Sequence, residues 1–144
     1  MKIAICSDHA GFELKSKIIE YLKTKEVSKL NDFGAYSSES SDYPDFAHPM
    51  AVSILKGDSD VGISICGSGN GISMTLNKHK GIRAALCWMP EIATLARKHN
   101  NANVLSLPAR FVSYSEAVQI IDAFLNSDFE GGRHQKRIDK IDIP

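Results

Sequence analysis

The stretch Val61-Gly62-Ile63-Ser64-Ile65-Cys66-Gly67-Ser68-Gly69-Asn70-Gly71 runs from a dense apolar segment straight into a loop with three glycines. A short apolar segment of this kind is typical of a strand that is buried on both faces, as strands of parallel sheets are. The glycines predict a tight turn, and we expect a helix from about Ile72 onward. Strand, glycine turn and helix in succession indicate a βαβ unit.

Short apolar segments alternate with helical patterns along the rest of the chain. We expect the other strands at 3–6, 28–33, 83–87 and 103–107. We expect helices at 12–25, 45–56 and 91–99, and another opened by the capping box Ser113-Tyr114-Ser115-Glu116. On the first helix Leu14, Ile18 and Leu22 share a face, with Lys15 mostly outside it. The sequence therefore predicts an α/β fold, a three-layer α/β/α sandwich with a Rossmann-like, mostly parallel five-stranded sheet.

The composition narrows the classes of protein. A chain of 144 residues predicts a single domain, 1–144. Lys+Arg 17 balance Asp+Glu 17, which argues against a nucleic-acid binder. Three cysteines form no disulfide framework, and no apolar run approaches the ~20 residues of a membrane span, so we expect a cytoplasmic protein without membrane contact. The polar tail, 127–144, must pack on something else or fray.

Ligands of such sheets bind beyond the carboxyl ends of the strands. The glycine loop there could direct backbone N–H groups at an anion. Its G-x-G-x-G spacing fits neither the dinucleotide fingerprint nor the phosphate loop of nucleotide hydrolases, and a tight turn without a ligand remains the alternative.

Cys66, directly before this loop, is the candidate nucleophile or proton acceptor, because converging N–H groups favour its thiolate. A phosphatase loop would need arginine at position 72, where Ile72 stands. A phosphoreceiver domain would need aspartate in place of the cysteine. We expect Cys6 and Cys87 to be packing residues.

None of the five histidines pairs with another at metal-ligand spacing, so no metal site is expected. His9 follows Asp8 at a strand end, as a cap or a ligand contact. His99 ends a helix, as a C-cap or an acid–base group. Arg133 and Arg137 would share a helix face, to bind phosphate or to remain solvated. An anion-binding loop, a thiol base, an acid–base histidine and an arginine pair, without a metal or nucleotide motif, fit metal-free proton transfer on a small phosphorylated substrate.

These pieces together resemble the type B ribose-5-phosphate isomerases, the family that includes galactose-6-phosphate isomerase subunits. The likeness covers almost the whole chain. It rests on Cys6-Ser7-Asp8-His9-Ala10-Gly11-Phe12, Ser41-Asp42-Tyr43-Pro44-Asp45, Cys66-Gly67-Ser68-Gly69-Asn70-Gly71-Ile72, Asn77-Lys78, Gly81-Ile82-Arg83-Ala84, His99-Asn100-Asn101-Ala102-Asn103-Val104-Leu105 and Gly131-Gly132-Arg133-His134-Gln135.

The resemblance implies interconversion of ribose 5-phosphate and ribulose 5-phosphate in the non-oxidative pentose phosphate pathway, without a cofactor. It implies that His99 opens the sugar ring, that Cys66 moves the carbon-bound proton and that Ser68 helps move the proton between the oxygens. The binding residues that it implies are Asp8, His9, Tyr43, Gly67, Gly69, Asn70, Gly71, Asn100, Arg110, Arg133 and Arg137.

The resemblance also implies a homodimer or a dimer of dimers, with each active site built across the interface and the tail packed on the partner subunit. One branch of the family uses a glutamate base where this chain has Ile72, so the cysteine branch applies. The galactose-6-phosphate subunits usually lack the counterparts of His99 and Arg133, which favours the five-carbon substrate here. A six-carbon phosphate such as allose 6-phosphate is the alternative substrate, and a non-catalytic sugar-phosphate binder is the alternative class.

Overall fold

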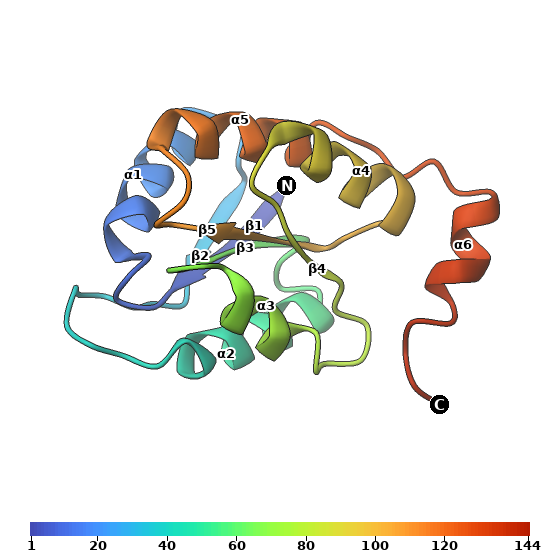
Figure 1. The fold of residues 1–144 in the computed structure, drawn as a ribbon, viewed down its shortest axis with the longest axis horizontal. Coiled ribbons are helices and arrows are strands. Elements are labelled where there is room, and N and C mark those ends of the chain that lie inside the picture. The colour runs from blue at the N-terminus through green and yellow to red at the C-terminus, as the bar shows by residue number, and fades with distance from the viewer.

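The computed structural model describes residues 1–144 and contains one five-stranded sheet in which every strand pair is parallel (Figure 1). The strand order is β2-β1-β3-β5-β4. The strands are β1 (Lys2–Ser7), β2 (Lys29–Asp32), β3 (Val61–Cys66), β4 (Ala84–Leu86) and β5 (Val104–Pro108). The predicted five-stranded sheet is confirmed, with all five strands at the expected places.

Helices cover both faces of the sheet (Figure 1). They are α1 (Phe12–Leu22), α2 (Tyr43–Leu55), α3 (Asn70–Leu76), α4 (Pro90–Asn100), α5 (Tyr114–Leu125) and α6 (Arg133–Ile138). One face carries α1, α4 and α5, the other carries α2 and α3, and α6 lies outside the layers beside α4. The predicted three-layer sandwich is therefore confirmed, and no helix is long and apolar enough to span a membrane.

The alternation of side chains along β1 shows why its sequence is apolar throughout. Ile3 and Ile5 belong to the core under α1, α4 and α5, whereas Ala4 and Cys6 belong to the core under α2 and α3. All four are fully buried. A strand between two helical layers has no solvent face, and period-2 alternation is therefore absent.

Local signals set where several helices begin. The Ser113 hydroxyl accepts a hydrogen bond from the Glu116 N–H at 3.1 Å, which confirms the capping box. Prolines lie in the first turns of α2 and α4, where a missing N–H costs nothing. Gly69, with φ of 75°, turns the chain from β3 into α3.

The polar tail finds part of its packing within its own chain. In α6, His134 and Ile138 are buried, and the helix packs on α4. Farther on, the Asp142 carboxylate accepts hydrogen bonds from the Gly81 N–H at 3.2 and 3.3 Å. Packing of this tail on a second chain stays a prediction.

The expectation that Lys15 lies outside the buried face of α1 is wrong. Its side chain is 1% exposed, and its ammonium group donates to the Asp32 carboxylate and to the Ala35 carbonyl, each at 2.6 Å. A lysine can be buried when a carboxylate and a carbonyl replace its water. Helix α1 also ends at Leu22, before the expected 25.

Candidate active site

A cavity of 580 Å³ opens at the carboxyl ends of β1 and β3. Eight of the site residues predicted from the sequence line it together: Asp8, His9, Tyr43, Cys66, Gly67, Ser68, Gly71 and Arg110. Ala10 and Phe111 complete the lining, and neither was predicted as a site residue.

Parallel pairing of β1 with β3 brings the Asp8 and Cys66 segments to one edge. Ser7 is paired with Ile65, so the next residue of each strand reaches the same end of the sheet. Asp8 donates its N–H to the Ile65 carbonyl at 3.3 Å, and its carboxylate accepts the Gly11 N–H at 3.1 Å. The Asp8 side chain is thereby held at the cavity wall.

The glycine loop follows Cys66 along the floor of the cavity. The thiol residue is only 4% exposed, and its carbonyl accepts the Ala109 N–H at 2.9 Å, which ties the loop to the end of β5. A side chain at Gly71 would strike the Tyr43 ring. The loop therefore packs with its backbone close to the cavity, as an anion cradle requires.

Ser68 and Asn70 extend the loop toward solvent, whereas Gly69 between them is buried against Leu86 and the backbone of Leu107. The Ser68 hydroxyl accepts from the N–H and the side-chain amide of Asn70, each at 3.3 Å. Asn70 lines the adjoining hollow, together with Ser68 and Phe111, rather than the cavity itself.

Two groups suited to phosphate lie in the cavity. His9 has its Nδ1 3.1 Å from the Ser41 carbonyl oxygen and donates its backbone N–H to the Ser41 hydroxyl, also at 3.1 Å. The Arg110 guanidinium packs over Gly67 and forms no ion pair with any carboxylate. A free guanidinium beside a histidine is a favourable place for a phosphate.

Cys6 and Cys87 are packing residues, as expected. Both are fully buried. Burial raises the pKa of Cys6 and raises that of Cys87 to about 12. Cys66 is the cysteine that lines the cavity.

Besides Gly69 and Asn70 of the glycine loop, four predicted site residues do not line this cavity. His99 and Asn100 end α4, and Arg133 and Arg137 lie on α6. The end of α4 leads into Asn103, whose carbonyl accepts the N–H of Gly62 near the start of β3. These residues therefore lie toward the amino edge of the sheet, whereas Cys66 lies at the carboxyl edge.

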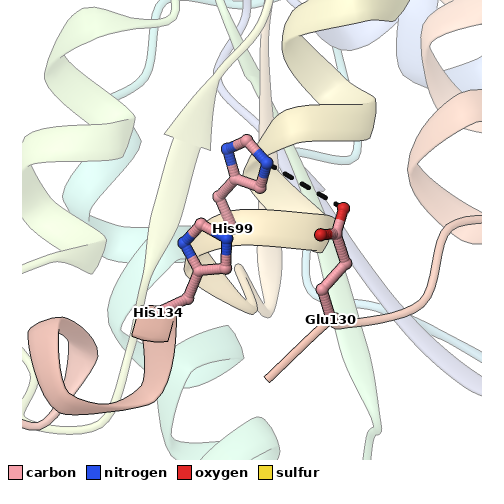
Figure 2. Close-up of side chains that lie close together, drawn as sticks. All are labelled: His99, Glu130 and His134. Carbon is pink, nitrogen blue, oxygen red and sulfur yellow. Dashed lines mark ion pairs between the residues drawn. The ribbon is translucent and has the colours of Figure 1, made fainter. Parts of the chain in front are cut away.

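His99 belongs to a cluster with Glu130 and His134 (Figure 2). The His99 Nε2 lies 3.9 Å from the Glu130 Oε1, and the two imidazole rings stack with centroids 4.3 Å apart and 12° between their planes. Burial and the nearby His99 and Arg133 lower the pKa of His134.

The fold brings together histidines that are far apart in the sequence. His48 Nδ1 also lies 2.7 Å from His79 Nε2. Sequence spacing gave no sign of either pair. In the His99 cluster the candidate ligand atoms lie within 4.8 Å of one another. A metal ion bound by both histidines would have to lie in the plane of each ring, ~2 Å from a nitrogen of each. The two stacked planes are nearly parallel, however, so no such position exists between these rings.

The cavity and the fold define a class, an α/β protein whose thiol and glycine loop line a cavity at the carboxyl edge of a parallel sheet. The sequence profile of the family described as Ribose/Galactose Isomerase matches residues 3–141. The chain belongs to this family.

The chain is similar to proteins named ribose-5-phosphate isomerase B. The probable enzyme of that name from Mycoplasma genitalium is 51% identical over 96% of this chain and 92% of its own length. The one from Escherichia coli is 46% identical over 97% of this chain and 93% of its own length.

Solved structures agree. A ribose 5-phosphate isomerase from Thermotoga maritima superposes with a TM-score of 0.95 and 53% identity, over 98% of this chain and 97% of that one. The Mycoplasma genitalium structure, described as containing bound ribulose-5-phosphate, gives a TM-score of 0.91 at 51% identity, over 97% of this chain and 93% of that one.

Proposed function

We propose that this chain is an aldose–ketose isomerase that interconverts D-ribose 5-phosphate and D-ribulose 5-phosphate, with 1–144 acting as one domain. The observation that carries the proposal is the position of the Cys66 thiol, at the end of β3 in a cavity with a glycine loop and a free Arg110. The names of the relatives and the ribulose 5-phosphate in one related structure support the same reaction.

In the proposed mechanism the Cys66 thiolate removes the proton from C2 of the open-chain aldose and returns it to C1. The intermediate enediolate carries negative charge on oxygen, which the N–H groups of the 67–71 loop stabilise. Ser68 passes a proton between the two oxygens, and Asp8 binds a sugar hydroxyl. His9 and Arg110 hold the phosphate. No net oxidation occurs, so the reaction needs no redox cofactor.

The active site in this proposal spans two subunits of a homodimer, alone or within a tetramer. The His99 and Asn100 segment and the α6 arginines lie toward the opposite edge of the sheet from Cys66, so a second chain would supply them. Large apolar side chains beside the cavity are exposed, Trp88 by 54% and Phe111 by 72%. Such a patch is typical of a protein interface.

The direct test is an isomerase assay on the purified protein with ribose 5-phosphate and EDTA, followed by allose 6-phosphate and galactose 6-phosphate. Conversion of ribose 5-phosphate supports the proposal. Exclusive conversion of a six-carbon phosphate would shift the substrate within the family, and binding without conversion would favour the binding-module alternative. The cytoplasmic location stays a prediction.

The role of Cys66 has its own test. Cys66→Ala should abolish turnover and leave sugar-phosphate affinity within about tenfold, because the thiol reacts but holds no phosphate. Iodoacetamide should inactivate the wild type, and substrate should protect it. Cys87→Ala is the matched control, since that thiol is buried away from the cavity. Turnover that survives in Cys66→Ala would exclude the thiol as the base.

A further inference from the structure

Glu130 lies in the segment between α5 and α6, and its surroundings connect it to the end of α4. Its backbone N–H donates to the Lys98 carbonyl at 3.0 Å, so the segment is fixed beside the residue before His99. Its carboxylate lies 3.9 Å from the His99 Nε2 (Figure 2). The distance is that of an ion pair rather than of a direct hydrogen bond.

The cluster leaves one ring nitrogen of His99 available. The Nε2 faces the Glu130 carboxylate, and one face of the ring is covered by His134. The Nδ1 has no hydrogen-bond partner within the chain, and the His99 side chain is 38% exposed. A carboxylate on one nitrogen and a free second nitrogen is the arrangement that orients an acid–base histidine toward a substrate.

The two rings differ in exposure. His134 is 8% exposed, and burial first, then the nearby His99 and Arg133, lower its pKa, while Glu130 acts in the opposite direction. The His99 side chain is 38% exposed and has the Glu130 carboxylate 3.9 Å from its Nε2. Within the pair, therefore, His99 is the ring that can reach a substrate, and His134 is a buried, flat support.

We propose that Glu130 is a positioning residue for His99 in the opening of the sugar ring, with His134 holding the plane of the imidazole. This rests on the proposed function, in which His99 serves the partner's cavity. During ring opening His99 takes the proton of the anomeric hydroxyl and delivers it to the ring oxygen as the C1–O4 bond breaks. The Glu130 carboxylate stabilises the imidazolium between these two transfers.

The two directions of the reaction separate ring opening from carbon-proton transfer. Ribose 5-phosphate is mostly a closed furanose, so the forward direction needs ring opening. Ribulose 5-phosphate is open, because the hydroxyl that could close a five-membered ring carries the phosphate. Its aldose product can leave open and close in water. The equilibrium constant fixes the ratio of the two kcat/KM values, so a defect in ring opening lowers both alike at low enzyme concentration. At high enzyme concentration, however, spontaneous ring opening limits only the forward direction of such a variant.

The experiment measures initial rates in both directions over a range of enzyme concentrations for the wild type and Glu130→Gln, with dimer content checked by gel filtration. Loss of the partner of a working histidine predicts a kcat/KM at least about tenfold lower, by the same factor in both directions. At high enzyme concentration the variant's forward rate should level off at the rate of spontaneous ring opening, while its reverse rate continues to rise with enzyme. The wild-type rate should continue to rise with enzyme in both directions.

Three further variants complete the test. Glu130→Asp keeps a carboxylate and should recover part of the forward rate. His134→Ala removes the stacked ring and should reproduce the levelling of the forward rate at high enzyme concentration without touching the carboxylate. Glu26→Gln, an exposed glutamate between α1 and β2, should leave both directions unchanged.

A lowered forward rate of Glu130→Gln that still rises in proportion to enzyme would mean a general structural role, and unchanged rates would mean no role; either result overturns the proposal. An inactive wild type would instead overturn the proposed function, so the two failures are distinguishable.

Discussion

Mixed dimers of Cys66→Ala and His99→Ala chains should regain activity that neither variant has alone. The expectation follows from the register of the sheet. Cys66 is paired with Pro108, the last residue of β5, whereas His99 precedes Val104, the first residue of that strand. Five residues of parallel strand extend roughly 15 Å, and an acid–base group must approach its substrate to about 3 Å. One chain therefore cannot bring both groups to one sugar.

The size of the recovery follows from two-fold symmetry. In a hybrid dimer one site receives two defects and the other receives none. A hybrid isolated with two different affinity tags should therefore show about half of the wild-type activity, and a random equal mixture about a quarter, because half of its dimers are hybrids. The assay is conversion of ribose 5-phosphate after co-expression. A hybrid no more active than its parents, or a fully active His99→Ala homodimer, would refute the shared site.

Three smaller predictions concern stability and loop geometry. Lys15→Met should lower the free energy of unfolding by about 2 kcal/mol in urea titrations, because it leaves Asp32, about a third exposed, without its buried partner. Burial and His48 lower the pKa of His79 in the folded protein, so the unfolded chain binds the proton more readily. The melting temperature should therefore fall as the pH drops below about 6.5. In His79→Gln it should fall less steeply. Gly71→Ala should raise KM for the sugar phosphate, since the added methyl strikes a neighbouring aromatic ring, and unchanged kinetics would argue against close packing of this loop.

The strands could be predicted because their burial in the sheet requires the same apolar residues that favour a strand locally. Val61–Cys66 was expected with the bounds that the structure has, since a strand buried on both faces must be apolar throughout. The edge strand β4 is shorter than expected, Ala84–Leu86, because only one neighbour stabilises it. The burial of Lys15 was not predictable, since its two partners lie 17 and 20 residues away.

In the candidate active site, too, some contacts follow from the order of the strands and others depend on distant segments of the chain. Asp8 and Cys66 each end a parallel strand, so their meeting at one edge follows from strand order. The pairing of His99 with Glu130 and His134 depends on how the α5–α6 connection returns along α4, which no periodicity encodes. Phe111 was missed because a single aromatic residue in a loop has no pattern that distinguishes it from packing.

The division of the catalytic groups between two edges of the sheet has a chemical logic in the proposed mechanism. Carbon-proton transfer benefits from a buried thiol and fixed N–H dipoles, which the glycine loop at the carboxyl edge supplies. Ring opening moves protons between oxygens and benefits from a histidine with a carboxylate partner, which the more exposed end of α4 supplies. In a parallel α/β fold the carboxyl ends of the strands lie at one edge of the sheet and the carboxyl ends of the helices at the other. Two copies that join the strand edge of one to the helix edge of the other would bring the thiol and the histidine to each substrate. Association of subunits would then be part of catalysis, and activity should disappear on dilution below the dimer dissociation constant.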